Sequence, residues 1–203
     1  MRVILLTVLW LASTDVLWSQ SVEIMGGNQR LFADVQWLKP LDTTYTWSVF
    51  SRARATIDYE GRSNLFLGVY GNVTSKIGLG GTLLGRIGTT ASGGDVGAHY
   101  FKSTKKWLFF GLASVGLNTH LELGYTWFSI LRFTPPLAKN LKLYTSLELF
   151  TTFNNRGHVY STQRVRLGLD WKGWQLGVAN NLAQIGQTPI LDNNIGAFIR
   201  KEF

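Results

Sequence analysis

The sequence has no cysteine, few prolines and no long apolar run. None of its 203 residues is Cys and only 4 are Pro. The lack of cysteine excludes disulfides and thiolate metal sites. Without an apolar stretch of about 20 residues, no transmembrane helix is expected. Acidic residues are also scarce, 12 against 20 basic ones, so the formal net charge is +8. The length fits one domain, or at most two.

The N-terminal residues follow the pattern of a secretory signal peptide. Arg2 precedes the apolar run "VILLTVLWLA", and Asp15 ends the apolar region. A basic residue, about ten apolar residues and a polar segment with small residues are typical of export signals. We expect cleavage between Ser19 and Gln20, with residues 1–19 as signal peptide and 20–203 as the mature domain. A buried N-terminal helix is the alternative.

From Arg30 onward, apolar and polar residues alternate in nearly every segment, which is the period of a β-strand. Turn-forming stretches such as "EGRS" and "WKGW" separate about eleven segments of roughly nine to fourteen residues, long enough to cross a bilayer when tilted. Because single-chain bacterial barrels have an even strand number, a short strand at 21–27 is expected as the twelfth. Ten strands is the alternative, if a weak segment such as 95–102 does not span.

Two architectures fit such strands: a soluble sandwich or lipocalin-like barrel, and a transmembrane barrel. Long strands favour the membrane, because soluble strands are usually about 5–6 residues. Tryptophan placement favours it too, because alternating the turns between two rims puts five tryptophans at one rim, as in the aromatic girdle of a membrane interface. These five are Trp37, Trp47, Trp107, Trp171 and Trp174.

The final segment reads "GAFIRKEF" and ends with Phe203. This ending resembles bacterial outer-membrane β-barrel proteins, whose last strand ends in an aromatic residue read by the assembly machinery. "WSQS" and "FIRKEF" are also similar to exported proteins of the Bacteroidetes group.

The resemblance implies a single all-β antiparallel barrel in the bacterial outer membrane. It implies Phe203 as the assembly signal, the outer-membrane assembly machinery as partner, and contacts with membrane lipids and lipopolysaccharide. The short turns "WKGW", "TPPLAKN" and "KSTKK" would then be periplasmic, and the connection at 183–193 would face outside.

Two similar stretches place arginines at matched depth. Arg52 and Arg54 in "RARATID", and Arg164 and Arg166 in "RVRLGLD", lie five and seven residues from the tryptophan that ends their strand. Alternation points all four into the lumen. In a ring of twelve strands the two strands are nearly opposite, so the four guanidinium groups are expected in one layer.

Charge of one sign inside a barrel must be compensated. Glu148, on the strand next to "RVRLGLD", is the expected partner of Arg164 or Arg166. Alternation also points these charges inward: Asp34, Lys76, Arg86, Asp95, Glu122, Arg132, Lys142, Arg200 and Glu202.

The charge layer leaves two functions open. One is a narrow pore for small anionic solutes with an arginine-lined lumen. The other is a closed structural or interaction barrel stapled by arginine–carboxylate pairs, which the mixture of signs favours slightly.

A lipid-modifying enzyme is a third possibility. By the expected topology His120 and His158 lie near the outer rim, with Glu122 and Ser161 nearby in sequence. No histidine has a partner at a diagnostic spacing, so no catalytic residue, metal or cofactor is expected. Nucleic acid is not an expected partner, because the arginines face the lumen and the lysines crowd the turns.

Overall fold

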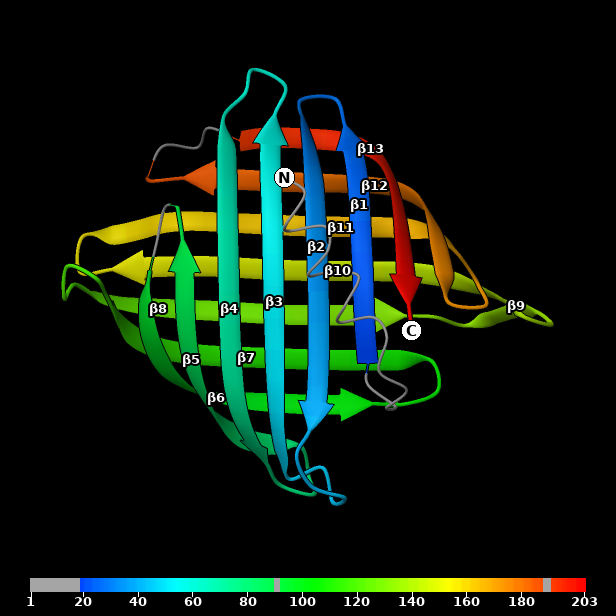
Figure 1. Ribbon diagram of the computed structural model, residues 1–203, viewed down its shortest axis with the longest axis horizontal. Coiled ribbons are helices and arrows are strands. Elements are labelled where there is room, and N and C mark those ends of the chain that lie inside the picture. The colour runs from blue at the N-terminus through cyan, green and yellow to red at the C-terminus, as the bar shows by residue number, and fades with distance from the viewer. Residues whose placement is uncertain (1–18, 90–91, 188–190) are drawn as a thin grey trace, which may run out of the picture.

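The computed structural model describes residues 19–89, 92–187 and 191–203, and the expected signal peptide up to residue 18 lies outside them. In the described residues, thirteen antiparallel β-strands form one sheet (Figure 1). The strands are β1 (Ser19–Gly27), β2 (Arg30–Pro40), β3 (Trp47–Asp58), β4 (Ser63–Thr74), β5 (Leu79–Gly88), β6 (Gly93–Ser103), β7 (Trp107–Asn118), β8 (Leu123–Phe133), β9 (Pro136–Ala138), β10 (Leu141–Asn154), β11 (Gly157–Trp171), β12 (Trp174–Ile185) and β13 (Leu191–Glu202).

The sheet closes into a barrel because β1 pairs with β2 on one side and with β13 on the other. Twelve strands complete the ring, while the three-residue strand β9 pairs with β10 alone. The predicted twelve-strand barrel with a short first strand is therefore confirmed. Ten strands is wrong, because the doubtful segment 95–102 lies within β6 and pairs along both edges. In Figure 1 strands β1–β4 of the front wall run across strands β7–β12 of the back wall.

Two connections differ from the sequence prediction. The expected turn "TPPLAKN" contains β9, whose Ala138 pairs with Leu141. The connection expected at 183–193 is shorter, because β12 continues to Ile185 and β13 begins at Leu191. The Asn- and Gln-rich sequence there is typical of a loop, but it pairs in register as strand.

The turn between β11 and β12 shows how local sequence fixes the register. Trp171 pairs with Trp174, so only Lys172 and Gly173 form the turn. Both have positive φ, 51° and 80° respectively. Positive φ at both central residues is the type I′ geometry that matches the twist of the flanking strands, and it favours glycine.

Alternation assigns the two faces of the wall. On β11, Val165, Leu167 and Leu169 face outward and are 41–51% exposed. Large apolar side chains are likewise exposed on the outer wall of the other long strands. Among the described residues there is no helix long and apolar enough to cross a membrane.

The lumen holds apolar packing that the sequence analysis did not predict. One buried cluster comprises Met25, Phe32, Tyr144, Ala179 and Phe198. A second comprises Leu112, Phe128 and Ile130, with Tyr70, Leu108, Phe110 and Phe150 packed against it. Apolar side chains therefore project into the lumen beside the charged ones, and arginines lie over rings of both clusters.

Candidate functional site

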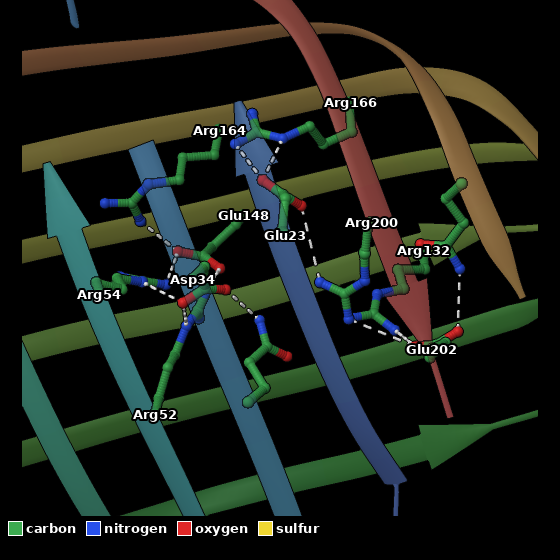
Figure 2. A network of polar contacts seen from close by, with 12 residues as sticks. Glu23, Asp34, Arg52, Arg54, Arg132, Glu148, Arg164, Arg166, Arg200 and Glu202 are labelled. Atoms are coloured by element: carbon green, nitrogen blue, oxygen red, sulfur yellow. Dashed lines mark hydrogen bonds and ion pairs between the residues drawn. The ribbon is translucent and has the colours of Figure 1, made fainter. Parts of the chain in front are cut away.

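The four predicted arginines come together in the lumen. Arg52 and Arg54 project from β3, and Arg164 and Arg166 from β11. Figure 2 shows that they point toward one another, with carboxylates between them. The register between β10 and β11 places Arg164 directly opposite Glu148, which favours their contact.

Glu148 and Asp34 form the centre of the layer. Glu148 Oε2 lies 2.7 Å from Nη2 of Arg52, and Glu148 Oε1 contacts both Arg54 and Arg164. Asp34 accepts from Arg52 Nε at 2.7 Å and from Arg54 Nε at 3.2 Å. Two carboxylates thus hold three guanidinium groups from opposite walls of the barrel.

Arg166 does not pair with Glu148. Its Nη2 lies 2.8 Å from Glu23 Oε1, and Glu23 Oε2 is 3.8 Å from Arg200. Glu202 continues the chain of contacts, at 3.4 Å from Arg200 and 2.8 Å from Arg132. The charged side chains therefore form two groups of ion pairs, one around Asp34 and Glu148 and one around Glu23 and Glu202 (Figure 2). Together they are called the network below.

Aromatic rings of the lumen cover part of the network. The guanidinium of Arg164 lies 5.4 Å from the ring centroid of Phe32, and that of Arg166 lies 5.7 Å from it. Arg52 lies 5.9 Å from the ring of Phe128. Stacking on aromatic faces stabilises a guanidinium that has lost its water.

The network carries a surplus of positive charge. Its six arginines face four carboxylates: Glu23, Asp34, Glu148 and Glu202. Several buried guanidinium nitrogens also have no hydrogen-bond partner within the described residues. These atoms are Arg52 Nη1, Arg132 Nε, Arg164 Nε and Arg200 Nε.

The side chains of the layer are buried and leave little space between them. Arg52 and Arg166 are each 4% exposed, and Asp34 is 2% exposed. The cavity among these side chains measures about 20 Å³. Such a space holds about one water molecule.

A larger hollow lies on one side of the layer and is called the vestibule below. It measures about 230 Å³, and Phe32 and Arg164 line it together with residues of the rim that carries the 59–62 turn. Arg30 contacts Asp58 at 3.0 Å and Asp192 at 2.5 Å there. Arg62, which is 81% exposed, lies near its mouth.

The five tryptophans lie toward the opposite rim, where the chain ends. Trp47, Trp107, Trp171 and Trp174 are 43–57% exposed and stand at strand ends. Trp107 stacks on Phe133 at a centroid distance of 4.1 Å. Trp37 lies further along β2, opposite Ser51. Phe203 is 65% exposed, and its amide donates to the carbonyl of Gln20 at the same rim.

The remaining predicted charges occupy different places. Asp95 is 4% exposed and contacts Arg86 in the lumen. Lys76 and Glu122 lie in turns, and Lys142 is exposed near a strand end.

The histidines also separate. His99 is buried and bonds Thr74 at 2.9 Å and Thr82 at 2.7 Å. His120 is exposed in a turn. His158 Nε2 lies 2.7 Å from Ser161 Oγ, a contact that the sequence spacing alone did not single out. No group of three or more His, Asp or Glu residues in the described part of the chain is arranged to hold a metal ion.

Glu23 is the member of the layer that the sequence analysis missed. It lies on β1, which was predicted only from strand parity. The register places Glu23 opposite Asp34 on β2 and opposite Arg200 on β13. Alternation within "SVEIMGG", with Ile24 on the outer wall at 48% exposure, is the signal that points Glu23 inward.

Comparisons with known proteins show a similarity of fold, but no match in sequence. No family model matches the sequence, and no curated protein sequence matches it. A solved KdgM porin aligns with 91% of this chain and 99% of its own, at a TM-score of 0.56 and 10% identity. LpxR from Salmonella typhimurium aligns with 91% of this chain and 100% of its own, at 0.53 and 9% identity.

The fold is similar to that of bacterial outer-membrane β-barrels. A KdgM porin in complex with disordered oligogalacturonate also aligns, at a TM-score of 0.53, 9% identity, and 91% and 99% coverage of the two chains. Identities this low concern the fold alone, so the chemistry of the lumen is argued from its own residues.

Proposed function

We propose that this chain is a bacterial outer-membrane barrel whose lumen is closed in its resting state by the arginine–carboxylate layer. The observation that carries the proposal is the burial of Arg52 and Arg166, each 4% exposed and held by carboxylates from other strands. A hydrated passage at this level would leave guanidinium groups exposed to water. The barrel then acts as a structural or interaction protein of the membrane.

The outer wall supports the membrane location. Its alternating rows expose Leu, Ile and Val on strands of ten to fifteen residues. A continuous apolar wall of this kind is unusual for a soluble monomer, because large exposed apolar patches favour association. Membrane lipids, lipopolysaccharide and the assembly machinery remain the proposed partners, and an origin in the Bacteroidetes group remains an expectation.

A narrow pore for small anionic solutes is the second candidate. It is favoured by the six arginines facing four carboxylates and by the vestibule that leads to Arg164. A solved KdgM porin was captured with oligogalacturonate, and its fold is similar. For this chain to conduct, Glu148 must release arginines so that the two walls of the layer separate.

Single-channel recording in planar bilayers distinguishes the two candidates. We expect the wild-type barrel to be silent and the double variant Arg54→Ala/Glu148→Ala to conduct, because it removes Glu148, which joins β10 to both arginines of β3, together with one of those arginines. Arg62→Ala, at the exposed mouth of the vestibule, is the matched control and should stay silent. Steady anion-selective steps from the wild type would overturn the closed barrel in favour of the pore.

A further inference from the structure

The outer wall of the barrel carries a serine–histidine pair outside the lumen. Ser161 lies on β11 opposite Thr151, and Thr151 lies opposite Trp127, which is 47% exposed on the outer wall. A register shift between Thr152 and Phe153 brings His158 opposite Phe153, on that same outer face. Both side chains are half-buried near the rim that carries the vestibule.

The hydrogen bonds fix the tautomer of His158. Its Nδ1 lies 2.6 Å from the carbonyl oxygen of Gly186, which can only accept. In the neutral ring Nδ1 therefore carries the proton, and Nε2 presents its lone pair. Nε2 is 2.7 Å from Ser161 Oγ, so it is placed to take the hydroxyl proton. A nucleophile, a base and a group that orients the base are the three parts of an activated serine.

The surroundings indicate what this serine would attack. Gln184 lies opposite Ser161 on β12, so its side-chain amide lies on the same face of the wall. Cross-strand neighbours have Cβ atoms about 4.5–5.5 Å apart, so this amide can reach an oxyanion formed at Ser161. Phe153 and Val159, 43% and 39% exposed, provide apolar surface for an acyl chain.

We propose that Ser161 and His158 form an acyl-ester hydrolase site for a membrane lipid on the outer wall. Ser161 Oγ attacks the ester carbonyl carbon while its proton passes to His158 Nε2. The proton then goes to the departing alcohol oxygen as the ester C–O bond breaks, leaving an acyl-serine. Water, deprotonated by His158, releases the carboxylic acid and restores Ser161. The lipid substrate rests on the membrane location proposed above.

The alternative is a structural hydrogen bond. Ser161 Oγ also lies 3.0 Å from Thr151 Oγ1, so its proton has a second acceptor. In addition, the acceptor for His158 Nδ1 is the backbone carbonyl of Gly186. This carbonyl orients the ring but carries no full negative charge. The test must therefore detect reactivity at Ser161.

A serine-reactive long-chain fluorophosphonate, applied to the purified full-length barrel in detergent, is the first probe. We expect covalent labelling on the peptide that contains Ser161, and its loss in Ser161→Ala. His158→Gln keeps a hydrogen-bonding side chain but not the base, so it should slow labelling by about 10²-fold or more. Ser51→Ala is the matched control, because Ser51 also lies on the outer wall, opposite Trp37 and Val69.

The outcomes decide the proposal. Undiminished labelling of Ser161→Ala, or no labelling of a wild-type barrel that migrates as folded, would overturn the activated serine. With labelling established, release of fatty acid from phospholipid in mixed micelles supports the lipid substrate. Turnover of p-nitrophenyl acetate alone would overturn it. None of these readouts depends on conductance, so the closed lumen is tested separately.

Discussion

At the scale of single residues, Glu148 contacts more arginines than the sequence analysis expected, which was Arg164 or Arg166. Its two oxygens contact Arg52, Arg54 and Arg164, and its side chain is 8% exposed. Removing one partner of a buried ion pair is costly because it leaves an uncompensated charge, whereas the intact pair adds little net stability. The layer therefore fixes which side chains meet, and its main energetic consequence appears when it is broken.

We expect Glu148→Gln to lower the free energy of unfolding by about 3–5 kcal/mol. Glutamine keeps the shape and one acceptor but leaves the three arginines without their shared charge. Urea unfolding in lipid vesicles, followed by tryptophan fluorescence, measures the loss. Glu60→Gln is the control, because Glu60 is 82% exposed and should change stability by less than about 0.5 kcal/mol. Equal stability of the two variants would mean that water fills the layer.

At the scale of elements, the turn between β2 and β3 is ordered by one carboxylate. Asp42 Oδ1 accepts from the amide of Trp47 at 2.7 Å, and Oδ2 accepts from the amide of Thr46 and the hydroxyl of Thr44. The hydroxyl of Thr44, followed by the amide of Trp47, lowers the pKa of Asp42 below its ordinary value. A carboxyl with a depressed pKa stabilises the turn above its unfolded pKa, and the contribution is lost as pH falls through the folded value.

We predict that the Trp47 amide resonance, followed by NMR in micelles, titrates with a midpoint below the ordinary range of aspartate. Asp42→Asn should abolish the transition, because the charge that the amides stabilise is gone. The variant should also be cut faster by proteases between residues 41 and 46. A midpoint at or above the ordinary value of a free aspartate would contradict the role of Asp42 in ordering this turn.

The outer row of β11 gives a prediction for the membrane itself. Leu167 is 51% exposed at mid-strand, so Leu167→Arg puts a charge against lipid and should cost about 2–4 kcal/mol. Leu121→Arg is the control, because Leu121 is 79% exposed in the turn between β7 and β8. Folding yield into vesicles and unfolding midpoints measure both. Equal tolerance would argue for a soluble barrel.

Arg166→Leu is not a suitable control for that experiment, although it is the neighbouring position. It removes the 2.8 Å contact of Glu23 with Arg166 and leaves the longer contact with Arg200 at 3.8 Å. Its loss of stability would report the lumen rather than the lipid face.

At the scale of the whole molecule, the barrel has two distinguishable rims. One carries the chain end, the tryptophans and the turns at 104–106 and 172–173, and the other carries the vestibule. Connections are short at both rims, so their lengths do not decide the orientation. The expectation that the tryptophan rim is periplasmic rests on the resemblance of the final strand to outer-membrane barrels.

Single cysteines test the orientation cleanly, because the chain has none. We expect Glu60→Cys to react with a membrane-impermeant maleimide on intact cells, and Lys105→Cys to react after the outer membrane is opened. Both positions are exposed in turns, at opposite rims. Labelling of Lys105→Cys but not Glu60→Cys on intact cells would reverse the topology.

The sequence by itself determined the architecture and the two faces of the wall. A period of two over many segments, together with turn residues such as Lys172 and Gly173, specifies strands, and their register follows because a slip by one residue would exchange the faces. Alternation was also sufficient to point Arg52, Arg54, Arg164 and Arg166 inward. The even strand number of bacterial barrels predicted the short first strand, which the local sequence pattern alone indicates only weakly.

The tertiary structure alone decided which groups meet. Glu23 meets Arg166 across the lumen from a strand that is not its neighbour, and a β-bulge brings His158 to Ser161. Sequence spacing predicts neither contact. The apolar clusters around Phe32 and Phe128 could not be predicted from the sequence either, because alternation shows only that a side chain points inward. Whether an inward side chain contacts water, an aromatic ring or a carboxylate depends on the opposite wall of the barrel. That wall comes close only when the sheet closes.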